Sequence, residues 1–341
     1  MSVCRGGSHL GVLLASALVA FGCTRLDREI VSTESSADPL MNAGSSEPIQ
    51  PITLATNLDP GKVALGRRLF LDVRFSRDAT MSCATCHDLA RSGVDGRRVA
   101  VGLGGAKGRR NTPTVFNSDL NEKQFWDGRA DTLEAQIDGP LLDEREMGGS
   151  WPNVLRVLRG DDVYSRAFVR LYGKQPVRED VRDALATYER TLRTPGSRFD
   201  RYLEGDQAAL SLAEREGYEA FQNYGCVSCH QGRNVGGNMF QKLGVVRDFV
   251  EEEDDVEDLG RFQVTHREID RNVFRVPSLR LVSRTAPYFH DGRIPTLQDA
   301  IVLMGRYQLG REIPSVDVER IASFLGSLAG ECTTEGPHAS R

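Results

Sequence analysis

Two short cysteine–histidine motifs constrain this chain of 341 residues more than any other feature. Both motifs have the spacing Cys-x-x-Cys-His, which is typical of covalent attachment of a c-type haem. Two thioether bonds would fix the porphyrin at two points, and the adjacent histidine would then lie beneath the iron as an axial ligand. A zinc site would need further paired ligands, and a thioredoxin-like site would not occur twice with a histidine following. The residues concerned are Cys83, Cys86 and His87 in the first motif, and Cys226, Cys229 and His230 in the second.

The first residues of the chain resemble an export signal, as the haem motifs require, because bacteria attach c-type haem outside the cytoplasm. Arg5 precedes an apolar run over residues 10–21 that is too short to span a bilayer. Residues 20–23 resemble a lipoprotein cleavage box, so we expect a signal peptide over 1–22 and a lipid anchor on Cys23. A soluble periplasmic protein cut nearby, or a retained anchor, is the alternative. Residues 23–55 lack apolar periodicity and are expected to form a flexible tether.

Charge and the remaining cysteines limit the partners that the chain can have. The formal net charge is 43 − 48 = −5, with no dominant basic stretch, which gives no support to nucleic-acid binding. An acidic surface suits a basic or dipolar protein partner. The acidic run over 251–258 is interpreted as a solvated loop, with a docking site as the alternative. Of the other cysteines, Cys4 and Cys23 belong to the export region, and Cys332 is expected to be a free thiol.

The two halves of the chain share more than the haem motif, which indicates a duplication. Residues 125–129 match residues 289–293 at an offset of 289 − 125 = 164, and residues 110–114 match 274–278 at the same offset. The haem histidines are separated by only 230 − 87 = 143 residues. The second half therefore carries 164 − 143 = 21 extra residues between its haem motif and the later match, where the acidic run lies.

Local signals predict small helical domains. Asp59-Pro60 should start a helix towards Phe70, and Ser211 and Thr296 should cap two others. Strand patterns are scarce. We therefore predict an all-α protein with two cytochrome c-like domains, over residues 56–197 and 198–331, followed by a tail over 332–341. The last predicted helix has one apolar face, formed by Val318, Ile321, Leu325 and Leu328.

The methionines distinguish the two haem sites. Met304 lies 14 residues past His290 on the helix that Thr296 caps, where a cytochrome c fold carries its methionine ligand, although a core methionine is the alternative. The matching position in the first half is 304 − 164 = 140, which is Pro140, and proline cannot bind iron. The second haem should then have His/Met ligation, and the first should be open. Met147 remains a rival ligand for the first haem.

From residue 60 to residue 330 the chain resembles the bacterial dihaem cytochrome c peroxidase and MauG family. The matching stretches are residues 81–87, 111–115, 124–130, 287–292 and 304–310. The resemblance implies two cytochrome c domains whose haems lie on either side of Trp126, although this tryptophan could also be an ordinary core residue. It further implies a distal glutamine at Gln136 and a catalytic glutamate at Glu146, which would otherwise be one member of a charged loop. An interdomain calcium ion is implied as well, bound by the Asn111 side chain and the carbonyl oxygens of Thr285 and Pro287.

One position departs from the family pattern. Many of these peroxidases carry a histidine that follows a glycine, 16 residues past the first haem histidine, and that caps the resting iron. This chain keeps Gly102 but has Leu103 at the histidine position, and leucine cannot ligate iron. We therefore expect a constitutively open first haem, as in MauG. MauG-type enzymes, however, have tyrosine where this chain has Met304.

The resemblance implies a periplasmic peroxidase that reduces hydrogen peroxide to water. The electrons would come from a small cytochrome c or cupredoxin, since the Met304 haem suits one-electron delivery. One alternative is a MauG-like enzyme that oxidatively modifies a protein or organic substrate, and another is a pure electron-transfer protein. Members of the family are often homodimers, so a homodimer is also considered.

Overall fold

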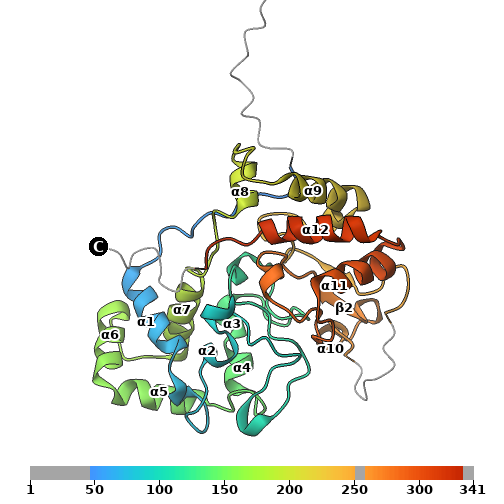
Figure 1. Cartoon of the computed structure of the whole chain (residues 1–341). Coiled ribbons are helices and arrows are strands. Elements are labelled where there is room, and N and C mark those ends of the chain that lie inside the picture. The colour runs from blue at the N-terminus through green and yellow to red at the C-terminus, as the bar shows by residue number, and fades with distance from the viewer. Residues whose placement is uncertain (1–46, 250–257, 333–341) are drawn as a thin grey trace, which may run out of the picture. The chain divides into compact units, whose positions relative to one another are not determined.

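The computed structural model describes residues 47–249 and 258–332, which belong to one compact unit that begins at Glu47 (Figure 1). The predicted signal peptide, Cys4, Cys23, residues 251–257 of the acidic run and all of the predicted tail but Cys332 lie outside the described residues. The described part is mostly helical, as predicted. None of its helices is long and apolar enough to cross a membrane.

The first half contains seven α-helices among its described residues, and helices α1 and α7 pack against each other beside the first haem motif (Figure 1). The helices are α1 (Pro60–Phe70), α2 (Cys83–Cys86), α3 (Leu133–Gln136), α4 (Asp138–Leu142), α5 (Trp151–Gly160), α6 (Asp162–Tyr172) and α7 (Arg178–Glu189). Short 3-10 turns join them: η1 (Val73–Phe75), η2 (Leu89–Arg91), η3 (Leu103–Gly105) and η4 (Ser118–Leu120).

The second half repeats this plan, with α9 and α12 as its packed helix pair. Its α-helices are α8 (Arg198–Leu203), α9 (Leu212–Tyr224), α10 (Phe262–Thr265), α11 (Leu297–Leu303) and α12 (Ser315–Ser327). The remaining turns are η5 (Cys226–Ser228), η6 (Glu268–Asp270), η7 (Val282–Arg284) and the π-helical η8 (Met304–Leu309). The only sheet in the described residues pairs β1 (Phe240–Lys242) with β2 (Val273–Arg275) antiparallel, with Gln241 opposite Phe274.

The helices begin where the sequence predicts, because their first backbone N–H groups find side-chain acceptors. The Asp59 carboxylate accepts hydrogen bonds from the N–H groups of Gly61 and Lys62, at 2.7 and 3.0 Å, and Pro60 occupies the first turn. Ser211 and Glu214 form a capping box at the start of α9. The Thr296 hydroxyl accepts from the Asp299 N–H and caps α11.

A glycine allows the helices of each pair to cross closely. A Cβ atom at Gly66 on α1 would collide with the Ala184 carbonyl oxygen and the Tyr188 side chain on α7. A Cβ atom at Gly217 on α9 would likewise collide with α12, at the Arg320 carbonyl oxygen and the Phe324 side chain. Both halves therefore use the same glycine-mediated crossing, which brings the last helix of each half against the helix that precedes the haem motif.

The backbone repeats as the sequence does. Phe125 and Phe289 both have a φ of 69°, which is rare for a bulky residue, and Asn117 and Leu281 have φ values of 59° and 62°. Both pairs are separated by 164 residues. Isolated β-bridges close the same turns in each half, between residues 124 and 130 and between residues 288 and 294. The matched segments therefore fold alike, which supports the predicted duplication.

Each half has its own hydrophobic core, and the chain that follows α12 returns to the first one. The first core includes Phe70, Phe116 and Phe168, and the second includes Phe199 and Phe324. A few segments of the second half join the two cores. Leu281 belongs to the first core, and Ala329 and the half-buried Cys332 pack against it. Cys332 forms no disulfide and is a free thiol, as predicted.

The tether prediction is wrong at its C-terminal end. The sequence predicts that residues 47–55 are flexible, but Ile49 is fully buried in the second core and Ile52 is also buried. The Gln50 carbonyl accepts a hydrogen bond from Arg280 at 2.9 Å, and the Ile52 N–H donates to Asp200 at 3.4 Å. Two isolated isoleucines in a polar stretch give no periodic signal, so only the tertiary contacts reveal that this segment is packed.

Substitution Gly66→Ala tests the role of the glycine crossing. We expect it to lower the free energy of unfolding by about 1–3 kcal/mol, because the methyl group forces α1 away from α7. Gly160→Ala, at the end of α5, is the control: no atom lies within 4 Å of the point where its methyl group would be, so its effect should be neutral or slightly stabilising. Denaturant unfolding measures both. An equal effect of the two substitutions would contradict the close-crossing argument.

Candidate functional site

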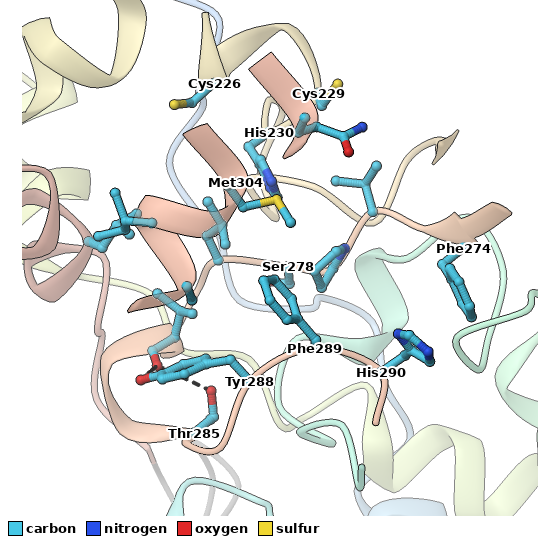
Figure 2. Close-up of a pocket in the computed structure, with 18 of the residues that line it drawn as sticks. Cys226, Cys229, His230, Phe274, Ser278, Thr285, Tyr288, Phe289, His290 and Met304 are labelled. Carbon is cyan, nitrogen blue, oxygen red and sulfur yellow. Dashed lines mark hydrogen bonds between the residues drawn. The ribbon is translucent and has the colours of Figure 1, made fainter. Parts of the chain in front are cut away.

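Each haem motif lines a large cavity with its two cysteines and its histidine. The first cavity is lined, among others, by Cys83, Cys86, His87, Trp126, Gln136, Pro140 and Glu146. The second is lined, among others, by Cys226, Cys229, His230, Trp126 and Met304 (Figure 2). The four motif thiols form no disulfide. The two cysteines and the histidine of each motif therefore line a single cavity.

The haem-motif histidines are oriented as axial ligands need to be. His87 Nδ1 lies 3.2 Å from the Gly93 carbonyl oxygen, and His230 Nδ1 lies 3.4 Å from that of Val235. If Nδ1 carries the hydrogen and donates it, Nε2 is left unprotonated and available to iron. Burial lowers the pKa of both imidazoles, that of His230 to about 4, so both are neutral. This donor set fits two c-type haems.

Met304 enters the second cavity at the junction of α11 and the π-helical turn η8. Its side chain and that of His230 extend into the same cavity (Figure 2). A π-helical turn changes the direction of the side chains that follow an α-helix and is frequent at functional sites. The position that corresponds to Met304 in the first cavity is Pro140, which lies in α4 and also lines its cavity. The two cavities thus differ at the place where a second axial ligand is expected.

The first cavity is lined by carboxyl groups, which are absent from the residues that line the second. Gln136 ends α3, and Glu146 lies in the loop after α4. Burial is the main cause that raises the pKa of the Glu146 carboxyl, and the charge of Asp143 adds to it, although Arg129 and Arg145 oppose the shift. A carboxyl with a raised pKa holds a proton more readily than a solvated one, so it can both take up and release a proton in the cavity.

The loop of Gly102 and Leu103 holds the Glu146 backbone. The Leu103 N–H donates to the Glu146 carbonyl at 3.1 Å, and a Cβ atom at Gly102 would collide with the Arg145 carbonyl. The Leu103 side chain is buried against Gly148, where an added Cβ would lie 2.8 Å from Leu103 Cδ1. Leu103 does not belong to the residues that line the first cavity, whereas Gly102 does. Met147, the rival ligand, lies in the first core and also lines this cavity.

Trp126 lies between the two cavities and lines both. Its indole N–H donates to the Asn111 carbonyl at 3.0 Å, and its own carbonyl accepts from the Arg275 N–H at 2.7 Å. The next residue, Asp127, belongs to an ion-pair cluster. The Arg110 guanidinium contacts the carboxylates of Asp127 at 2.6 Å and Asp258 at 2.7 Å. Both halves therefore hold the segment that carries the tryptophan.

The residues predicted to bind calcium all line the second cavity. The Asn111 side-chain amide donates to the Arg97 carbonyl at 2.9 Å, which turns its Oδ1 the other way. Within residues 47–249 and 258–332, no group of three or more His, Cys, Asp or Glu side chains could hold a metal ion. A calcium site here would therefore depend on neutral amide and carbonyl oxygens and on water.

Several buried ionisable residues at the cavities are not predicted from the sequence, among them Arg275 and Glu189. Arg275 lines the second cavity and donates to the Phe125 carbonyl at 3.2 Å and to Asn121 Oδ1 at 3.0 Å. Glu189 lines the first cavity and is 5% exposed. One signal could have revealed Glu189: it lies four and eight residues after Leu185 and Val181, so it continues the apolar face of α7.

Comparison with known proteins places the chain among dihaem enzymes. The family model described as di-haem cytochrome c peroxidase matches residues 60–208. Cytochrome c peroxidase Ccp of Escherichia coli is 46% identical over 84% of this chain, and the match spans 62% of that relative's length. Cytochrome c551 peroxidase of Nitrosomonas europaea is 42% identical, over 84% of this chain and 85% of its own. The crystal structure of a MauG-like protein associated with microbial copper homeostasis aligns with a TM-score of 0.72 and 27% identity, over 85% of this chain and 96% of that one.

Substitution Met304→Leu tests the assignment of the second axial ligand. Leucine keeps the apolar volume but cannot bind iron, so one low-spin ferric signal in the electron paramagnetic resonance spectrum should become high-spin. Met147→Leu is the matched control and should leave the spectrum unchanged, since this methionine packs in the first core. A spectrum that changes in the Met147 variant and not in the Met304 variant would contradict the assignment.

Proposed function

The chain belongs to the di-haem cytochrome c peroxidase family, whose members are oxidoreductases that act on peroxide. We propose that it reduces hydrogen peroxide in the first cavity, with electrons that enter at the second. The observation that carries this proposal is the asymmetry of the cavities: Met304 in the second is replaced by Pro140 in the first, beside Gln136 and Glu146. When bound, the two haems supply the redox chemistry, one as an electron carrier and the other with an open coordination position.

Glu146 handles the proton in this reaction. Reduction of one hydrogen peroxide molecule consumes two electrons and two protons and yields two water molecules. The Glu146 carboxyl takes the proton from one peroxide oxygen and returns it to the other, so that the O–O bond breaks with water as the leaving group. Its raised pKa supports this role, because a carboxylate with a raised pKa is a stronger base than an ordinary glutamate. Gln136 lines the same cavity and orients the peroxide.

Trp126 carries the electrons between the two haems in this proposal. Its position in the wall of both cavities, held by Asn111 on one side and Arg275 on the other, supports that route. The names of the relatives indicate a cytochrome as the donor. We propose a small cytochrome c, with a cupredoxin as the alternative. The net charge of −5 suits a basic or dipolar donor surface.

We further propose that the first haem is open without reductive activation. Leu103 stands where many relatives carry a capping histidine, and leucine provides no ligand. Its loop is already bonded to the Glu146 backbone, so the carboxyl is held in the cavity in this structure. The open site and the bonded loop together support a peroxidase that reacts in its resting state.

A MauG-like oxidation of a protein or organic substrate is the second candidate function. The absent capping histidine favours it, whereas Met304 replaces the tyrosine of MauG-type enzymes and favours electron delivery from a donor. The two curated relatives compared above are peroxidases as well. Steady turnover of hydrogen peroxide with a reduced small cytochrome c separates the two functions, because a modification enzyme would show little of it.

The remaining proposals concern the surroundings of the enzyme. We propose a calcium ion held by Asn111 Oδ1 and by the carbonyl oxygens of Thr285 and Pro287, supported by their position at one cavity. We also propose a periplasmic protein with a lipid anchor on Cys23, supported by the cleavage-box pattern of residues 20–23. A homodimer is proposed from the resemblance to the family alone.

Low-temperature electron paramagnetic resonance of the oxidised protein tests the open first haem. We expect one high-spin and one low-spin ferric signal at rest, and loss of the high-spin signal when hydrogen peroxide is added. Two low-spin signals without a response to peroxide would show that another residue fills the site, and would exclude a constitutive peroxidase.

Substitution Glu146→Gln tests the proton-transfer role. We expect kcat/KM for hydrogen peroxide to fall by about 10²–10⁴-fold, because the amide cannot accept the proton. The pKa of Glu146 is raised, so the wild-type rate should fall as pH decreases through a value above the ordinary range of a glutamate, and the variant should lack this limb. Glu144→Gln is the control, since Glu144 is exposed and pairs with Arg77. A similar loss in both variants would contradict the role of Glu146.

A further inference from the structure

Glu189 is a buried carboxyl in the first cavity that the proposed mechanism does not use. It ends α7, whose residues Val181 and Leu185 line the same cavity. A carboxyl on the apolar face of a helix is costly to bury, so it needs hydrogen-bond partners. Its partner here is Gln136, whose side-chain nitrogen lies 3.2 and 3.4 Å from the two carboxyl oxygens.

The duplication shows that this pair belongs to the first cavity alone. The glycine crossings align Tyr188 of α7 with Phe324 of α12, at an offset of 324 − 188 = 136. Glu189 then corresponds to residue 189 + 136 = 325, which is Leu325 and lines the second cavity. Gln136 corresponds to residue 136 + 164 = 300, which is Ala300 and also lines it. Both positions are apolar around the electron-transfer haem and polar where peroxide reacts.

No cation in the described residues lies within ion-pair distance of Glu189. The nearest basic residue in the sequence, Arg190, pairs instead with Glu134 at 2.6 Å. The charges of Glu134 and Asp119 oppose ionisation of Glu189. The hydrogen bond with Gln136 is therefore the contact from which the role of Glu189 is inferred.

We propose that Glu189 is a positioning residue that fixes the amide of Gln136, so that Gln136 turns its carbonyl oxygen towards the reactive cavity. This inference rests on the proposed function. An acceptor in that position can receive a hydrogen bond from the O–H of an incoming hydrogen peroxide molecule, whereas a donor in the same position cannot. Without its partner the amide is free to rotate, and its NH₂ group can face the cavity instead.

Ionisation of Glu189 adds a pH dependence to this role. Burial without a cation raises its pKa to about 8, although Arg190 opposes the shift. The carboxyl is therefore neutral at neutral pH, and its carbonyl oxygen still accepts from Gln136. Above that pKa it becomes a carboxylate at the cavity wall, which disfavours the approach of an anion to the first haem.

Fluoride binding to the ferric first haem of the complete protein tests the inference, because fluoride accepts hydrogen bonds but cannot donate one. Glu189→Leu installs the residue of the second cavity and frees the amide. We expect fluoride affinity to rise about tenfold as the NH₂ group turns inward, and the rate of reaction with hydrogen peroxide to fall about tenfold. Glu189→Gln retains a carbonyl acceptor and should restore both values near neutral pH. The loss of fluoride affinity above pH about 8 should be steeper in the wild type than in this neutral variant.

Glu179→Gln is the matched control, because it is the same kind of substitution on the same helix, at an exposed residue outside the first cavity. Fluoride and peroxide values within twofold of the wild type in Glu189→Leu, or equal effects in the Glu179 variant, would overturn the inference. A low-spin first haem would instead contradict the proposed function, and the same fluoride comparison would then be made after reduction of the second haem. The two failures are therefore distinguishable.

Discussion

The contact between each haem-motif histidine and a backbone carbonyl is the interaction on which both sites depend. His87 faces the carbonyl of Gly93, and His230 faces that of Val235. These contacts leave Nε2 of each ring directed into its cavity, while burial keeps the imidazole neutral. The carbonyls occupy equivalent turns, in which Ser92 and Val235 adopt left-handed backbone conformations with φ values of 60° and 49°. The same contact between a histidine and a backbone carbonyl thus orients both histidines towards a haem iron.

Function comes from the way in which the two environments differ on the opposite side of the cavity. The second cavity presents Met304 and is lined by no carboxyl group, whereas the first presents Pro140 together with the carboxyl groups of Glu146 and Glu189. A thioether ligand suits a haem that only passes electrons. An open position with a carboxyl nearby suits one that breaks a bond. In the proposed function, the duplicated fold thereby separates electron entry from chemistry without a change in its helix packing.

The junction between the halves connects the two cavities through Trp126. Trp126 reaches both cavities because the segment that carries it is bonded to Asn111, Arg275 and, through Asp127, to the Arg110 cluster. The Arg110 contacts are mostly buried, so their ionic hydrogen bonds are weakly screened by solvent. These contacts hold Trp126 in the wall of both cavities, on the electron route of the proposed function.

The sequence by itself determined the two haem motifs, the 164-residue repeat, the helical class and the correspondence of Met304 to Pro140 in the repeat. These features depend on residue spacing, which survives without knowledge of distant contacts. Only the tertiary structure decided that Ile49 and Ile52 are packed, that Leu103 turns away from the first cavity and that Glu189 meets Gln136. Residues 53 positions apart meet because α7 crosses α1 at Gly66 and delivers its last residue to the cavity. Helix crossings are set by the packing of whole surfaces, and no local pattern of residues encodes them.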